Sequence, residues 1–207
     1  MPLAADLWEE NTDLARASLD HPFVQGIGSG QLALASFKIY VGQDAVFLEA
    51  FIRAYALALA KAPDQEGLHM FKDLLLGVFD ELSLHRGFAE RWGADLSPAP
   101  LPSTRAYTDF LLSISGLEPV GHIAAAMTPC MRLYAWLGQT LKTMGQPGSP
   151  YREWVEAYSD PALDTLVARL ENLLDRYGGD EARIRSHYRT AMELELGFFE
   201  GAWKAGQ

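Results

Sequence analysis

Two acidic residues occupy positions where a packed helix would place apolar side chains. Asp44 shares one helical face with Phe47 and Phe51, three and seven residues further on. Glu195 stands three and four residues before a pair of phenylalanines. A carboxyl group on an apolar face must find a partner or take up a proton, because burial disfavours its charged form. Both residues are therefore candidates for acid–base chemistry, although an exposed edge position or a structural ion pair explains either one as well.

The chain has a single cysteine, Cys130, which directly follows Pro129 within a helical pattern. A thiol acts as a nucleophile where a neighbouring group lowers its pKa or accepts its proton. A proline inside a helix removes the hydrogen bond to the carbonyl four residues earlier, so Pro129 predicts either a kink beside the thiol or a helix boundary. The alternative role of Cys130 is that of a small, inert buried residue.

Three tyrosines, Tyr107, Tyr134 and Tyr158, fall on helical faces with apolar neighbours. A pocket for a flat heterocycle would use both the ring and the hydroxyl group of such residues. Ordinary packing in the core explains the same positions without a ligand.

Glu81 and His85 lie one helical turn apart, a spacing that can hold a metal ion. A di-metal centre in a helical bundle needs two such pairs and further carboxylates on facing helices, and the sequence has one convincing pair. Pairing on a helix surface explains Glu81 and His85 at least as well. The sequence therefore predicts no metal site.

The segments that must position these residues are helical. Apolar residues recur at three- and four-residue spacing between proline and glycine breaks, and no alternating strand pattern or hairpin turn is present. The stretches with this spacing cover residues 8–19, 34–55, 68–82, 107–114, 123–141, 151–158, 163–177 and 184–203. The prediction is an all-α bundle of about seven or eight helices that forms one domain over residues 1–207. Ser103 or Thr104 is expected to cap the helix around Tyr107, and Asp180 to begin the last helix.

Composition argues against several kinds of partner. The chain has 17 Lys and Arg against 27 Asp and Glu, a formal net charge of -10, and the basic residues do not cluster. Neither nucleic acid nor an anionic membrane is expected to bind it. One cysteine excludes an intrachain disulfide and suits a reducing compartment. The amino terminus lacks a signal-peptide pattern, and residues 45–60, the most apolar stretch, are too short to cross a bilayer. We therefore expect a cytoplasmic protein.

Five segments resemble the TenA/thiaminase II family in order and spacing. Residues 42–48 (GQDAVFL) resemble its QDxxFL segment, residues 126–134 (AMTPCMRLY) its PCxxxY helix, and residues 195–199 (ELGFF) its terminal ExxFW segment. Residues 20–23 (DHPF) and 151–158 (YREWVEAY) are similar as well. Each motif is weak by itself, but together they extend over essentially the whole chain.

This resemblance implies a haem-oxygenase-like bundle without haem or another cofactor, usually assembled as a homotetramer. It implies thiamin salvage, in which 4-amino-5-aminomethyl-2-methylpyrimidine is converted to the 5-hydroxymethyl compound with release of ammonia. Many members also cleave thiamin, the thiaminase II activity. By position, Cys130 would be the nucleophile toward C6 of the pyrimidine, and Glu195 the general acid–base. The ring would be held by Asp44 at its amidine edge and by Phe47, Tyr107, Tyr134 and Tyr158.

Two departures from the family pattern leave the preferred substrate open. Phe199 stands where tryptophan is common, and Met131 and Arg132 replace a more usual aromatic and aliphatic pair. Arg132 points away from the Cys130 thiol on an ideal helix, so we expect it at an interface or on the surface. The substrate is then the aminomethylpyrimidine, its formylated precursor, thiamin or a related heterocycle. Two other classes also remain open: a metal-dependent oxidoreductase on the same bundle, and a non-catalytic pyrimidine-binding or regulatory protein.

Overall fold

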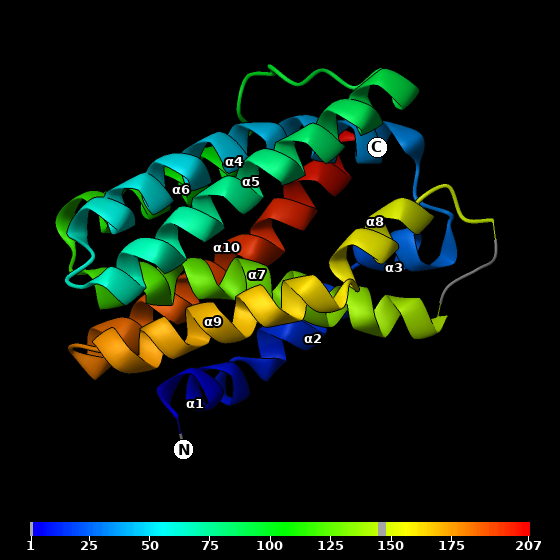
Figure 1. The fold of residues 1–207 in the computed structure, drawn as a ribbon. Helices are drawn as coiled ribbons and strands as arrows, with labels where there is room; N and C mark the ends of the chain where they lie inside the picture. Colours follow the sequence, from blue (N-terminus) through cyan, green and yellow to red (C-terminus); the bar gives the residue numbers. More distant parts are fainter. Residues whose placement is uncertain (1, 145–147) are drawn as a thin grey trace.

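The chain folds into α-helices joined by short loops (Figure 1) in a computed structural model that describes residues 2–144 and 148–207. Within these residues the helices are α1 (Leu3–Glu10), α2 (Thr12–Asp20), α3 (Pro22–Ser29), α4 (Leu34–Lys61), α5 (Gln65–Trp92), α6 (Pro102–Leu117), α7 (Val120–Met144), α8 (Arg152–Tyr158), α9 (Pro161–Tyr177) and α10 (Glu181–Ala205). The described part of the chain contains no strand, which confirms the all-α prediction. Its ten helices exceed the predicted seven or eight.

Two local features account for the additional helices. Asn11 divides the first predicted stretch, because its side-chain amide donates to the Leu7 carbonyl at 2.8 Å and its backbone N–H donates to the Trp8 carbonyl. The short helix α3 begins at Pro22, which suits the first helical position, and ends at Gly30, whose φ of 74° favours glycine. This eight-residue segment contains two glycines, so its apolar spacing did not predict a helix.

Proline and glycine breaks in the sequence coincide with helix junctions: residues 62–63 with α4–α5, 118–119 with α6–α7, 160–161 with α8–α9 and 177–179 with α9–α10. Another such break, at residues 144–150, lies partly outside the described residues. Asp180 begins α10 as predicted, since its carboxylate accepts hydrogen bonds from two N–H groups of the first turn. The predicted cap of α6 is wrong. That helix begins at Pro102 after Leu101, and Ser103 and Thr104 lie inside its first turn. The fixed φ of proline is suited to this first position.

Helix α7 runs through Pro129 without ending, so a helix boundary at residues 127–129 is the wrong interpretation. Thr128 Oγ1 donates to the Ala124 carbonyl, one turn earlier, at 2.7 Å. Because α7 is continuous, Cys130 lies in the middle of a largely buried helix.

The long helices form two groups around α10 (Figure 1). Helices α4, α5 and α6 lie together on one side, and α7 and α9 lie on the other, with α10 between them. Helix α4 packs against α5, α6 and α10, whereas α7 packs against α8, α9 and α10. Residues from four helices can therefore meet in the interior. None of the described helices combines the length and apolar character needed to cross a bilayer.

A close contact between α7 and α8 depends on Gly138. A Cβ at this position would lie 2.3 Å from the backbone carbonyl oxygen of Tyr158. Only a residue without a side chain lets the end of α8 come this close to α7. This contact brings Tyr158 to the same region of the interior as Cys130.

Candidate active site

A cavity of about 280 Å³ lies between α4, α5, α7, α8 and α9. Its walls are mostly apolar and aromatic, with a few polar side chains, as is typical of sites for small ligands. Of the seven site residues that the sequence predicts, five line it: Asp44, Phe47, Cys130, Tyr134 and Tyr158. Glu81 also lines the cavity, although it was not among the residues predicted to bind a ligand.

The other two predicted residues, Glu195 and Tyr107, form a buried pair beside the cysteine. The Tyr107 hydroxyl on α6 donates to Glu195 Oε1 on α10 at 2.7 Å. Both side chains are about 1% exposed. The Cys130 thiol on α7 lies close enough to the Glu195 carboxyl that each group affects the pKa of the other. The fold therefore places the candidate nucleophile next to the candidate acid–base group.

Burial sets the protonation of both groups. It raises the pKa of Glu195 to about 8, so this carboxyl keeps its proton at pH 7. Burial, and then the nearby carboxylates, raise the pKa of Cys130 well above its usual value. The thiol at rest is therefore protonated and needs a neighbouring group to take its proton before it can attack.

Asp44 is held by a histidine of the facing helix. His85 Nε2–H donates to Asp44 Oδ2 at 2.6 Å, and its Nδ1–H donates to the Glu81 backbone carbonyl at 3.0 Å. Burial by itself would lower the pKa of His85, but Asp44 raises it to about 9, so the imidazole is positively charged at pH 7. Among the described residues His85 is the one hydrogen-bond partner of this carboxyl group, which leaves Oδ1 for a ligand.

This ion pair corrects the prediction of a surface pair between Glu81 and His85. His85 is 1% exposed and its partner is on another helix. One signal in the sequence could have shown this. His85 lies seven residues after Val78 and three before Phe88, on a face whose apolar residues are buried.

Glu81 forms a second polar contact in the cavity. The Tyr158 hydroxyl donates to Glu81 Oε1 at 2.5 Å. Burial, followed by the charge of Asp44, raises the pKa of Glu81. The Tyr134 ring packs edge-on against Tyr158, with 4.8 Å between centroids, and its hydroxyl accepts a hydrogen bond from Tyr40 at 3.3 Å. These tyrosines line the cavity while their hydroxyl groups bond to protein groups.

Arg132 lies outside this cavity. Its Nε is 3.5 Å from Glu171 Oε1, and its guanidinium lies 4.8 Å from the centroid of the Trp8 ring. The half-buried side chain thereby connects α7 with α9 and α1. This agrees with the expectation that it points away from the thiol.

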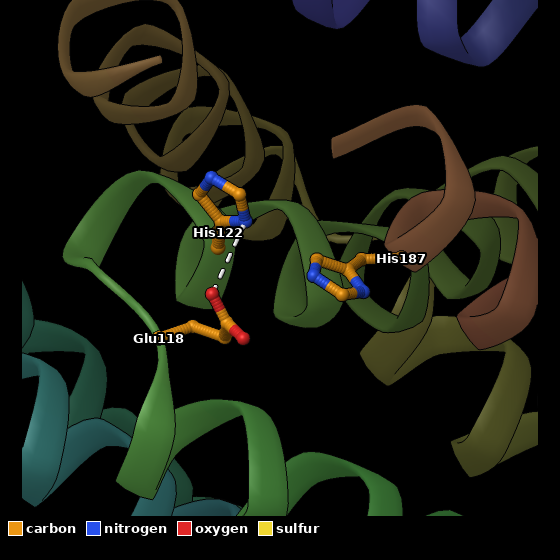
Figure 2. Close-up of side chains that lie close together, drawn as sticks. All are labelled: Glu118, His122 and His187. Carbon is orange, nitrogen blue, oxygen red and sulfur yellow. Dashed lines mark ion pairs between the residues drawn. The ribbon is translucent and has the colours of Figure 1, made fainter. Parts of the chain in front are cut away.

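One cluster of at least three potential metal ligands occurs in the described part of the chain, and none of its members lines the cavity. It consists of Glu118, His122 and His187 (Figure 2). Over residues 2–144 and 148–207, Glu81 and His85 belong to no such cluster.

Comparison with known proteins identifies the family. The sequence model of the TENA/THI-4/PQQC family matches residues 8–205. The chain belongs to this family. An aminopyrimidine aminohydrolase of Halalkalibacterium halodurans is 30% identical over 217 residues, which cover 98% of this chain and 96% of that protein. The TenA homologue of P. horikoshii OT3 superimposes with a TM-score of 0.92 at 26% identity over 99% of this chain and 100% of that one.

Two further relatives define the fold and the extent of the match. Haem oxygenase-1 of Synechocystis superimposes with a TM-score of 0.64 at 18% identity over 97% of this chain and 91% of that one, which confirms the haem-oxygenase-like fold. The bifunctional TH2 protein of Arabidopsis thaliana is 31% identical over 95% of this chain. The chain spans only 36% of that protein's length.

Proposed function

We propose that this protein is an aminopyrimidine aminohydrolase of thiamin salvage that works by covalent catalysis from Cys130. The observation that carries the proposal is that Asp44 and Cys130 line one small cavity and that the buried Glu195 carboxyl lies beside the Cys130 thiol. The likeness to a protein named as an aminopyrimidine aminohydrolase over nearly its whole length supports the same reaction. The substrate would be 4-amino-5-aminomethyl-2-methylpyrimidine, and the product its 5-hydroxymethyl analogue.

In the first step the sulfur of Cys130 bonds to C6 of the pyrimidine, and the electron pair of the C6–N1 double bond moves to N1. Glu195 is protonated and contacts the thiol, so it supplies a proton to N1 and takes the thiol proton in exchange. Tyr107 holds one oxygen of the carboxyl group during this exchange. The adduct keeps a C4–C5 double bond next to the 4-amino group, which is an enamine.

In the second step the enamine expels ammonia from the C5 methylene group, and positive charge develops on the 4-amino nitrogen. The free Oδ1 of Asp44 is suited to accept a hydrogen bond from this amino group and to stabilise the charge. Water then adds to the exocyclic methylene carbon, and sulfur leaves C6 as N1 gives up its proton. Water has replaced ammonia, and the thiol is regenerated.

Glu81 and Tyr158 are the residues we assign to the leaving amine. An alkylamine is protonated at neutral pH, and the cavity has carboxyl groups of Asp44 and Glu81 in its lining. Glu81 accepts a short hydrogen bond from Tyr158 and keeps a second oxygen for a cationic substituent. The same arrangement suits the thiazolium cation of thiamin, so thiamin cleavage belongs to the proposal as a second activity.

We further propose that residues 1–207 act as one cytoplasmic domain, that no cofactor is needed, and that four chains assemble. Leu76 and Phe79 support the assembly, because they are about half exposed and lie on α5 next to residues that line the cavity. Large apolar side chains exposed together commonly mark an interface. Light scattering on the purified protein measures the assembly directly.

The test is ammonia release from the aminomethylpyrimidine, with thiamin cleavage measured in parallel. We expect turnover by the wild-type protein, and a loss of at least about a thousandfold in Cys130→Ser with an unchanged circular dichroism spectrum. Release of neither product by the wild-type protein would overturn the proposal. Binding of the pyrimidine in calorimetry without turnover would instead show a non-catalytic pyrimidine-binding protein.

A further inference from the structure

We propose that Glu118, His122 and His187 form a binding site for a divalent transition-metal ion, with Zn²⁺ as the best match. Glu118 directly follows α6, His122 lies in the first turn of α7, and His187 lies on α10 (Figure 2). Their ligand atoms all lie within 4.8 Å of one another. Two imidazoles and one carboxylate are a donor set typical of zinc sites with an open position for water.

The two histidines have buried nitrogens without partners. His122 Nδ1 and His187 Nε2 are buried and make no hydrogen bond among the described residues. His122 is 3% exposed, and its Nδ1 lies 3.7 Å from Glu118 Oε2, the contact drawn in Figure 2. Buried polar atoms in folded proteins nearly always have a partner. A metal ion between these three atoms would satisfy all of them.

The distances need only a modest contraction. Zinc bonds to nitrogen and oxygen at about 2.0–2.2 Å, so ligand atoms around a tetrahedral ion are about 3.3 Å apart. The ligand atoms of the three residues lie within 4.8 Å of one another, so each pair must approach by at most about 1.5 Å to bind zinc.

Neighbouring residues hold the ligands in this orientation. Arg183 donates to Oε1 of Glu118, so Oε2 is the oxygen that faces His122. Gly179 packs against the other side of the His122 ring, where a Cβ would lie 2.8 Å from Nε2. The second cation in this region, Lys61, is bound to three backbone carbonyls at the end of α6, including that of Glu118. Such outer contacts commonly orient the ligands of metal sites.

The position of the site suggests a structural role. His122 precedes Cys130 by eight residues on α7, and His187 precedes Glu195 by eight residues on α10. Eight residues correspond to about 12 Å along a helix. A bound ion would therefore connect the two helices that carry the candidate nucleophile and acid–base group, without touching the cavity.

The test uses the full chain, stripped of metal with a chelator and titrated with ZnCl₂ in a calorimeter. We expect one Zn²⁺ per chain and a rise of the thermal unfolding midpoint with zinc, because an ion that binds only the folded state stabilises it. His187→Gln should weaken binding at least about tenfold, since even the loss of an outer contact costs 10–100-fold. His69→Gln is the matched control, because His69 is an exposed histidine on α5, and it should bind as the wild type does.

Two further measurements keep the test decisive. Glu118→Gln should reproduce the loss seen in His187→Gln, and circular dichroism of both metal-free variants reports whether they fold. Absence of zinc binding by the wild-type protein would overturn the proposal. So would binding that survives in both variants but disappears in Cys130→Ser, because zinc would then occupy the active-site cavity.

Discussion

Replacing Glu195 by glutamine is expected to lower activity and raise stability at the same time. Glutamine keeps the shape of the side chain and an oxygen that accepts the hydrogen bond from Tyr107, but it has no proton to exchange. Loss of a general acid–base group commonly lowers kcat about 10²–10⁴-fold. The effect on stability has the opposite sign and follows from the raised pKa.

The pKa of Glu195 is about 8 in the folded protein, against an ordinary value of 4.5. Between these two values the unfolded chain gives up the proton while the folded chain keeps it, so the free energy of unfolding falls as the pH rises, by about 1.4 kcal/mol per pH unit. From pH 4.5 to pH 7 this amounts to about 3 kcal/mol. Glutamine does not ionise, so Glu195→Gln should not lose stability in this way and should be about 3 kcal/mol more stable than the wild type at pH 7.

Urea denaturation of both proteins at pH 5, 6, 7 and 8 measures the difference. It should widen steadily over this range and stop widening above pH 8. Glu193→Gln, which replaces an exposed carboxyl of the same helix, is the matched control and should change stability by less than about 0.5 kcal/mol. A difference that does not vary with pH, or full activity in Glu195→Gln, would refute the reasoning, because the carboxyl would then be ionised or unused.

Three other substitutions test the remaining contacts. His85→Gln should lower the free energy of unfolding at pH 6 by about 3–5 kcal/mol in urea denaturation, because it leaves a buried carboxylate unpaired. The wild type should lose part of its stability as the pH rises from 6.5 to about 9, and the variant should lack this pH dependence. An equally stable variant would show that the pair is not charged. Glu81→Gln should raise the Kd of the cationic aminomethylpyrimidine by about 10–100-fold in calorimetry, and it should change the Kd of the neutral hydroxymethyl product by only a few-fold. Equal losses of affinity for the two ligands would refute the role assigned to Glu81. Gly138→Ala should lower the free energy of unfolding by about 1–3 kcal/mol and reduce kcat, because the added methyl group displaces Tyr158. Gly87→Ala is the control, because a Cβ at this helical position meets no other atom, and it should raise the free energy of unfolding by about 0.5–1 kcal/mol. Similar losses of stability in both variants would contradict the close approach of α8 to Gly138.

Most of the candidate site could be predicted because its polar and charged residues stand among apolar neighbours in the sequence. Asp44 and Glu195 interrupt apolar faces, and the structure confirms that both are buried. The partners of these residues could not be predicted in the same way. His85 looked like half of a surface pair with Glu81, since the spacing of four residues is the same whether a face is exposed or buried. Its true partner is 41 residues away in the chain.

The sequence alone determined the helical class and several of the places where helices end, such as the junction between α9 and α10. These properties depend on interactions within a few residues, such as proline at a first turn or an aspartate that caps a helix. It did not predict α3, whose glycines weaken the local signal and whose apolar residues, such as Phe23, are buried by contacts with distant helices.

Only the tertiary structure decided which groups meet and which of them carry protons. Cys130 and Glu195 are 65 residues apart in the chain, and their contact exists because α7 packs against α10. The same packing removes water from the Glu195 carboxyl and raises its pKa, an effect that depends on every helix around it. The cluster of Glu118, His122 and His187 likewise joins three elements. Local sequence reports the conformation of a segment, whereas desolvation and charge pairing are properties of the assembled fold.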